Sequence, residues 1–237
     1  MANNFKNAVR RNISADSGLP TEIYKAPDTK KSIAIEIDVS NKSSAGVTVT
    51  VQLEDESLNE TYDTTGTVIA ANAHAISAVA TGVSGLFTTT SSAVHNLIVN
   101  DRVMFVAGTE PSFTNASLPP SGDTELSTPT STPTTSRNRI YYVQSVPSTS
   151  TFTIAESASA ASPLTFDDTG ATTKMIKVHL ADIVKDAPVP VGGSLKVISG
   201  QKLVIESQTA NVNDKIFVTS SAANAVDCVA SVLQDVS

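Results

Sequence analysis

Apolar and polar residues alternate with a period of two in two segments near the N-terminus. In segment 33–39 the alternate apolar positions are Ile33, Ile35, Ile37 and Val39. In segment 47–54 they are Val47, Val49, Val51 and Leu53, with Thr, Gln and Glu between them. This alternation is typical of β-strands that have one buried and one solvent-exposed face. We therefore expect both segments to be strands that turn these apolar side chains toward a core.

The same pattern returns in the C-terminal part of the chain. It predicts strands over 177–184, 194–199, 202–207, 215–221 and 226–233. Pro188 and Pro190 follow the first of these, and because proline cannot donate to a ladder we expect an edge or a turn there. Gly200-Gln201 is predicted to be the two-residue connector of a tight hairpin. Helical periodicity is nearly absent, so the sequence predicts an all-β fold: a small antiparallel sandwich of jelly-roll or immunoglobulin-like type.

Between these two parts the composition shifts toward Thr, Ser, Ala and Pro. A second set of strands is predicted over 75–80, 86–89, 102–106, 139–146, 151–155 and 164–166. We expect residues 64–173 to be an inserted small β-barrel, and residues 1–63 with 174–237 to be one split sandwich. The stretch 108–138 is rich in Ser, Thr and Pro and has almost no apolar residues. A loop of this length is expected to be exposed, and functional, mobile or ordered by a partner.

Charge and cysteine content narrow the class of protein. The 237 residues carry a net charge of −7, which argues against a general nucleic-acid binder. The single cysteine, Cys228, excludes an internal disulfide, and alternation places it on one face with Val226, Ala230 and Val232. We expect this thiol to be buried, because free Cys behaves as a small apolar residue. No signal peptide and no long apolar segment is evident, so we expect synthesis in the cytoplasm and no membrane insertion.

Candidate chemical groups are few and scattered. The three histidines, His74, His95 and His179, lack a second His or Cys at ligand spacing, so a zinc site is not expected. Asp167-Asp168 is interpreted as the start of a tight turn rather than a cation site. Glu54-Asp55-Glu56 is interpreted as a solvated loop rather than a calcium site, because no glycine-bearing loop of oxygen ligands follows. No serine lies in a nucleophile elbow and no phosphate-binding glycine loop occurs, so neither an enzyme nor a cofactor is expected.

The N-terminal segment combines apolar and basic residues. Phe5, Val9 and Ile13 recur at helix-like spacing, and the basic residues between them are Lys6, Arg10 and Arg11. The segment is either a short amphipathic helix or an extended basic arm. Two interpretations stay open: docking onto an acidic neighbouring subunit through Phe5, Lys6, Arg10 and Arg11, or a loosely ordered terminus.

The two flanks resemble small structural proteins of tailed-phage virions, especially those from phages of marine bacteria and cyanobacteria. The residues that carry the resemblance are 2–8 (ANNFKNA), 24–27 (YKAP), 183–192 (IVKDAPVPVG), 200–204 (GQKLV), 218–223 (VTSSAA) and 232–233 (VL). The insert is similar to a β module of phage tail, fibre and decoration proteins. That similarity lies in 95–97 (HNL), 100–105 (NDRVMF), 141–143 (YYV), 151–154 (TFTI) and 164–166 (LTF).

The resemblance implies a virion location and a non-enzymatic role in assembly or surface attachment. The expected partners are portal or neck, tail or major capsid proteins and further copies of the chain, with no nucleic acid and no membrane. The alternative is an adhesin or fibre module that binds a receptor or glycan on the host. For that role the paired Tyr141 and Tyr142 are the candidate recognition residues, although the chain has no Trp to add aromatic stacking.

Overall fold

The computed structural model describes residues 4–58, 74–79, 85–89, 95–109, 139–165, 171–207, 210 and 212–236. These residues form fourteen strands and no helix, and all the strand pairs are antiparallel. The prediction of an all-β antiparallel fold is confirmed. The chain divides into two compact units, unit 1 (Met1–Leu58 with His179–Ser237) and unit 2 (Asn59–Val178).

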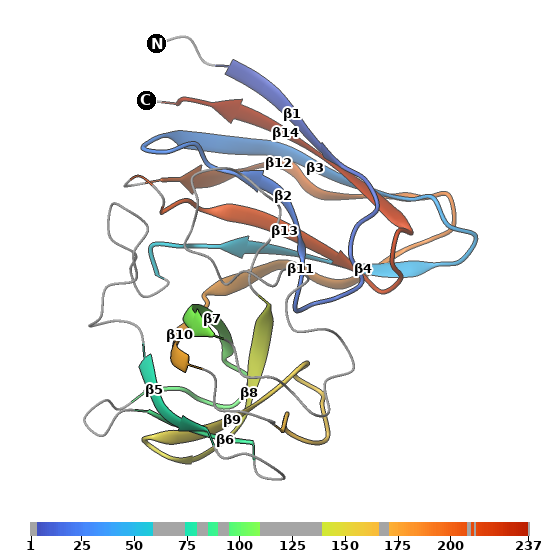
Figure 1. The fold of residues 1–237 in the computed structure, drawn as a ribbon. Helices are drawn as coiled ribbons and strands as arrows, with labels where there is room; N and C mark the ends of the chain where they lie inside the picture. Colours follow the sequence, from blue (N-terminus) through green and yellow to red (C-terminus); the bar gives the residue numbers. More distant parts are fainter. Residues whose placement is uncertain are drawn as a thin grey trace. The chain divides into compact units, whose positions relative to one another are not determined.

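Unit 1 consists of two four-stranded sheets (Figure 1). Sheet 1 has the order β1 (Asn4–Arg10), β14 (Val226–Gln234), β3 (Lys31–Asn41) and β12 (Ser194–Glu206). Sheet 2 has the order β11 (Leu180–Val189), β4 (Val47–Glu54), β13 (Lys215–Ser220) and β2 (Thr21–Lys25). Buried side chains from both sheets form one hydrophobic core, which gives a sandwich-like arrangement.

Alternation correctly predicts the buried face of β14 and of the first half of β4. Val47, Val49 and Val51 of β4 are buried in the core, but beyond them the prediction is wrong, because Gln52 and Glu54 are buried and Leu53 is half-buried. In β14 the side chains of Val226, Cys228, Ala230 and Val232 are all 0% exposed, as predicted for the thiol. Of the two alternatives for the Pro188 stretch, an edge or a turn, the structure shows the edge, because β11 is an edge strand and contains Pro188.

In β3 the predicted face is wrong in the first half of the strand. Ala34 is fully buried, whereas Ile35 is 36% exposed. Ala34 and Glu36 are paired with residues of both neighbouring strands, β14 and β12, but Ile35 between them is paired with neither. This extra residue is a β-bulge, which changes the phase of alternation. Beyond it Ile37 and Val39 face the core, as predicted.

The predicted hairpin at Gly200-Gln201 is also wrong. Residues 194–206 form the single strand β12, which pairs with β3 along its length. Gly200 has a φ of 74°, and the register shifts between Ser199 and Leu203. Glycine adopts this left-handed conformation at low cost, so here it supports a bulge and not a chain reversal.

Unit 2 holds β5 (His74–Val79), β6 (Leu86–Thr89), β7 (Arg102–Thr109), β8 (Ile140–Ser148), β9 (Thr151–Ala155) and β10 (Ala171–Lys177). They pair in the order β10-β5-β6-β9-β8-β7, and β7 pairs back with β10. Their core contains Phe87, Tyr141, Phe152, Ile154 and Met175.

Two predicted boundaries change in unit 2. The predicted domain boundary between residues 173 and 174 falls inside β10, whose last residue Lys177 still pairs with Val103 of β7. The predicted strand 164–166 is not formed by Leu164 and Thr165, although Leu164 is buried and its N–H donates to the Ile154 carbonyl at 2.8 Å. Of the predicted loop 108–138, Gly108 and Thr109 end β7, and 110–138 lie outside the described residues.

Candidate functional site

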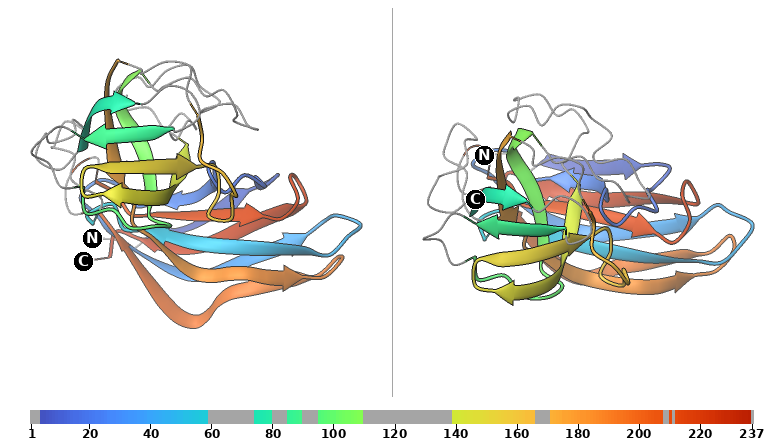
Figure 2. Two further views of the ribbon diagram at one scale, coloured as in Figure 1. Left: turned by 90° about the horizontal axis from the view of Figure 1, so that it is seen from below. Right: turned by 60° about the horizontal axis from the view of Figure 1, so that its bottom comes forward.

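The N-terminal segment is a β-strand and not a helix. β1 pairs with β14 from Asn4↔Gln234 to Arg10↔Cys228 without a register shift. Figures 1 and 2 show β1, in blue, at the outer margin of sheet 1 beside the red strand β14. The helix alternative is therefore wrong, and the segment is an extended strand integrated into the sheet.

The two faces of β1 differ in chemistry. Ala8 is buried and faces the core, whereas Phe5 and Val9 on the opposite face are 73% and 47% exposed. Lys6 and Arg10 share the face of Ala8 but are exposed, because β1 lies at the margin of the sandwich. Arg10 Nε donates to the Glu22 carbonyl of β2 at 2.9 Å, so this side chain spans the gap between the sheets.

Phe5 begins a row of apolar residues that crosses all four strands of sheet 1. The register aligns Phe5 with Leu233, Leu233 with Ile33, and Ile33 with Val204. Phe5 and Val204 are exposed, and Leu233 and Ile33 are half-buried. Nine large apolar side chains are exposed in the described part of the chain, and five lie on sheet 1: Phe5, Val9, Ile35, Val204 and Val229. We call this outer surface of sheet 1 the apolar face.

Charge is distributed unevenly around the apolar face. Residues 1–15 contain three basic residues and no acidic one, in a chain with a net charge of −7. Farther along the sheet, Lys196 of β12 pairs with Glu36 of β3 and holds the pKa of that carboxyl below its ordinary value. Burial raises the pKa of the neighbouring Asp38, and the Glu36 charge adds to this effect. The β1 edge is therefore basic, with Lys6 and Arg10 on the opposite side of the strand from Phe5 and Val9.

A second polar feature lies where the chain leaves β4, and the sequence interpretation of it was wrong. Glu54 and Glu56 are 1% and 7% exposed, so Glu54-Asp55-Glu56 is not a solvated loop. Glu56 accepts a hydrogen bond from the Asn213 backbone N–H at 2.7 Å and pairs with Lys215 Nζ at 2.9 Å. Glu54 lies 3.7 Å from the same Nζ. We call Glu54, Glu56, Asn213 and Lys215 the buried clamp.

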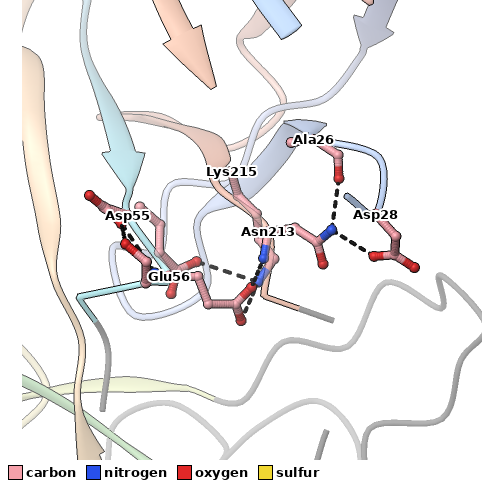
Figure 3. A network of polar contacts seen from close by, with 8 residues as sticks. Ala26, Asp28, Asp55, Glu56, Asn213 and Lys215 are labelled. Carbon is pink, nitrogen blue, oxygen red and sulfur yellow. Dashed lines mark hydrogen bonds and ion pairs between the residues drawn. The ribbon is translucent and has the colours of Figure 1, made fainter. Parts of the chain in front are cut away.

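Asn213 extends the buried clamp to the β2–β3 turn (Figure 3). Its side-chain Nδ2 donates to the Ala26 carbonyl at 3.0 Å and to Asp28 Oδ1 at 2.7 Å. The next residue, Asp214, accepts a hydrogen bond from the Ala26 N–H at its carbonyl. Burial raises the pKa of the Asp214 carboxyl. No periodic signal in the sequence marks Asn213 as a buried residue.

His95 has a structural role in unit 2. Its ring is 3% exposed and lies edge-on to Phe152, with the centroids 5.2 Å apart. Nδ1 accepts from the Leu97 N–H at 3.0 Å, so Nε2 carries the proton and donates to the Ser148 carbonyl at 3.2 Å. His179 belongs to unit 1. Within the described residues no group of three or more His, Cys, Asp or Glu is placed to hold a metal ion.

The paired tyrosines do not form an exposed recognition site. Tyr141 is 1% exposed and belongs to the core of unit 2, with the Arg139 guanidinium 6.0 Å above its ring. Alternation turns Tyr142 to the other face of β8, where it is half-buried. The proposed recognition role of Tyr141 is therefore corrected: its ring fills the core. Asp167 and Asp168 lie outside the described residues.

Neither a scan of family models nor searches of curated proteins and of solved structures gives a match. Among the described residues there is no helix of the length and apolarity needed to cross a bilayer.

Proposed function

We propose that the chain is a non-enzymatic structural protein of a tailed-phage virion, associated with the neck or tail or decorating the capsid. In this role it assembles or stabilises the particle by binding other virion proteins and further copies of itself. The sequence resemblance of both flanks and of the insert to phage structural proteins supports the proposal. We further infer that unit 2 is a small β-barrel module carried by the sandwich of unit 1.

The observation that carries an assembly role is the apolar face of sheet 1. Contiguous exposed apolar surface is uncommon on a monomer and marks a site of interaction. Here five exposed apolar side chains gather on one sheet, and a row of four apolar residues crosses every strand of it. An exposed apolar face of this kind suits contact with another protein surface. In a symmetric particle, weak contacts of each subunit add together through repetition.

The test is the position of the chain in the particle. Antibodies raised against the purified chain would be applied to intact phage particles and examined by electron microscopy. Label arranged as a ring at the neck, along the tail or over the capsid is expected. Label confined to distal fibre tips would instead favour the adhesin alternative, and particles that lack the chain altogether would refute the proposal.

A further inference from the structure

The four sheet edges of unit 1 differ in how well they are protected against pairing with another strand. β11 has two register shifts, contains Pro188 and places Asp186 at a φ of 48°. β12 is bulged around Gly200. β2 has only five residues, and the Arg10 side chain is bonded to its Glu22 carbonyl. Bulges, proline, short strands and charged side chains are among the devices by which proteins block their sheet edges.

The backbone of β1 has no bulge and no proline, and the protection that β1 carries is the charge of Lys6 and Arg10. Its seven residues pair with β14 in unbroken register, and β1 is the last strand of its sheet. It contains no proline and no glycine. The outer edge of β1 therefore offers a straight row of backbone donors and acceptors, to which an extended segment can add as a further strand.

The side chains of β1 specify the chemistry of that segment. In a strand added to β1, alternate residues lie beside Phe5 and Val9 on one face and beside Lys6 and Arg10 on the other. Apolar residues on the first face would continue the row from Val204 to Phe5. Acidic residues on the second face would neutralise the basic pair. We infer that β1 receives an extended segment of a partner protein in which apolar and acidic residues alternate.

Charge argues against β1 of a second copy as the occupant. If two β1 strands paired antiparallel about Asn7, Phe5 would meet Val9, but Lys6 would lie diagonally to Lys6 and Arg10 of the other copy. Like charges at these positions repel. A β1–β1 dimer would therefore strengthen as salt screens the repulsion, whereas binding of an acidic segment weakens with salt. The inference rests on the proposed assembly function, for which it names the partner's chemistry.

The experiment measures binding of three synthetic peptides to the full chain by fluorescence anisotropy. Each is as long as β1, seven residues, with valine alternating with glutamate, threonine or lysine. We expect the glutamate peptide to bind most tightly and the lysine peptide not at all. Binding of the glutamate peptide should weaken as salt rises from roughly 0.05 M to 0.5 M. Hydrogen exchange should show new protection of alternate β1 amides.

Two charge variants test whether the glutamate peptide binds at β1. Lys6→Glu should weaken binding of the glutamate peptide by about fivefold or more, because attraction becomes repulsion. Lys202→Glu is the matched control, since Lys202 is an exposed lysine on the other edge strand of sheet 1. It should bind as the parent does, and unchanged thermal unfolding of Lys6→Glu would show that its fold is intact.

Three results would overturn the inference: equal binding of all three peptides, equal loss in both variants, or no new protection in β1. Dimerisation of the chain that strengthens with salt and protects β1 would show that a second copy is the occupant instead. These peptide-binding results do not test the proposed function, which is tested by the position of the chain in the particle. If the chain is found in phage particles but the glutamate peptide does not bind to β1, the proposed function is retained and only this inference is refuted.

Discussion

Removing the Glu56 carboxylate should destabilise unit 1 substantially. In Glu56→Ala the Asn213 N–H, which now donates to Glu56 Oε2 at 2.7 Å, loses its acceptor. A buried donor without a partner costs about 1–3 kcal/mol. Lys215 also loses its 2.9 Å partner, while Glu54 stays 3.7 Å away. Breaking a buried pair outright costs about 3–5 kcal/mol, and the remaining carboxylate reduces this. We expect a total loss of about 3 kcal/mol.

Cys228 provides an assay that is specific to unit 1. It is the only cysteine of the chain, it is fully buried, and burial raises the pKa of its thiol to about 12. A thiol reagent therefore labels Cys228 only when the sandwich opens. If opening equilibrates faster than labelling, the labelling rate follows the opening equilibrium. A loss of about 3 kcal/mol corresponds to labelling roughly 100-fold faster than in the parent.

Two further variants separate the buried clamp from general surface effects. Glu56→Gln keeps an oxygen for the Asn213 N–H but removes the charge, so its labelling rate should lie between those of parent and alanine variant. Glu36→Ala breaks the Lys196–Glu36 pair, which is open to solvent, and should leave the rate unchanged. The argument fails if Glu56→Ala accelerates labelling less than about threefold, or if Glu36→Ala matches it.

Three other predictions concern the same unit. Gly200→Ala should cost about 1 kcal/mol, because Gly200 has a φ of 74°, whereas Gly46→Ala, with open space and no positive φ, should be neutral or slightly stabilising in urea unfolding. Burial raises the pKa of Asp214, so its contribution to stability is present at low pH and is lost as pH rises through the folded-state pKa. The free energy of unfolding of Asp214→Asn should therefore fall less than that of the parent as pH rises from about 4 to 7, as measured by urea midpoints. An equal change of the urea midpoint with pH in both proteins would contradict this. A chain in which a short Gly/Ser linker replaces residues 59–178 should keep Cys228 protected and unfold cooperatively, because the linker joins two ends of one β ladder. Free labelling of Cys228 would contradict the split-unit model.

The sequence predicted the strands of unit 1 best where alternation is unbroken. β14 keeps one phase throughout, and its buried face is the predicted one, whereas in β4 the phase changes after Val51, where Gln52 and Glu54 become buried. The bulges at Ile35 and Gly200 interrupt the phase in β3 and β12. The sequence of a strand alone does not reveal such a bulge, because a residue is extra only relative to the residues of the neighbouring strands. Pairing partners are not visible in local periodicity.

The N-terminal strand was missed for a different reason. Phe5 and Val9 are four residues apart, a spacing that puts side chains on one face of a helix. Four is also an even number, so the same two residues share one face of a strand. The pairing of β1 with β14, far away in the sequence, decides between these conformations. The basic and apolar character of the segment was recognised from the sequence, whereas the sheet edge that it forms was not.

Charged residues of the buried clamp were misjudged because burial of a carboxylate depends on its partner. Glu56 follows the end of β4, where a polar run is typical of a solvated loop. Lys215 and Asn213, more than 150 residues away, supply the compensating charge and donor. Buried charges are tolerated when they are paired and hydrogen-bonded. No local pattern connects these two parts of the chain.

The position of the buried clamp explains how unit 1 accommodates an insertion of about 120 residues, Asn59–Val178. Glu54 at the end of β4 is paired with Leu180 at the start of β11, so the two ends of the insertion meet at neighbouring strands. If the insertion were a flexible chain, closing it instead of a loop of about ten residues would cost about 2 kcal/mol more. The contribution of about 3 kcal/mol expected from Glu56 is of the same size. Glu56 fixes the chain to β13 just before the insertion begins, so the N-terminal side of the junction is anchored within unit 1 itself.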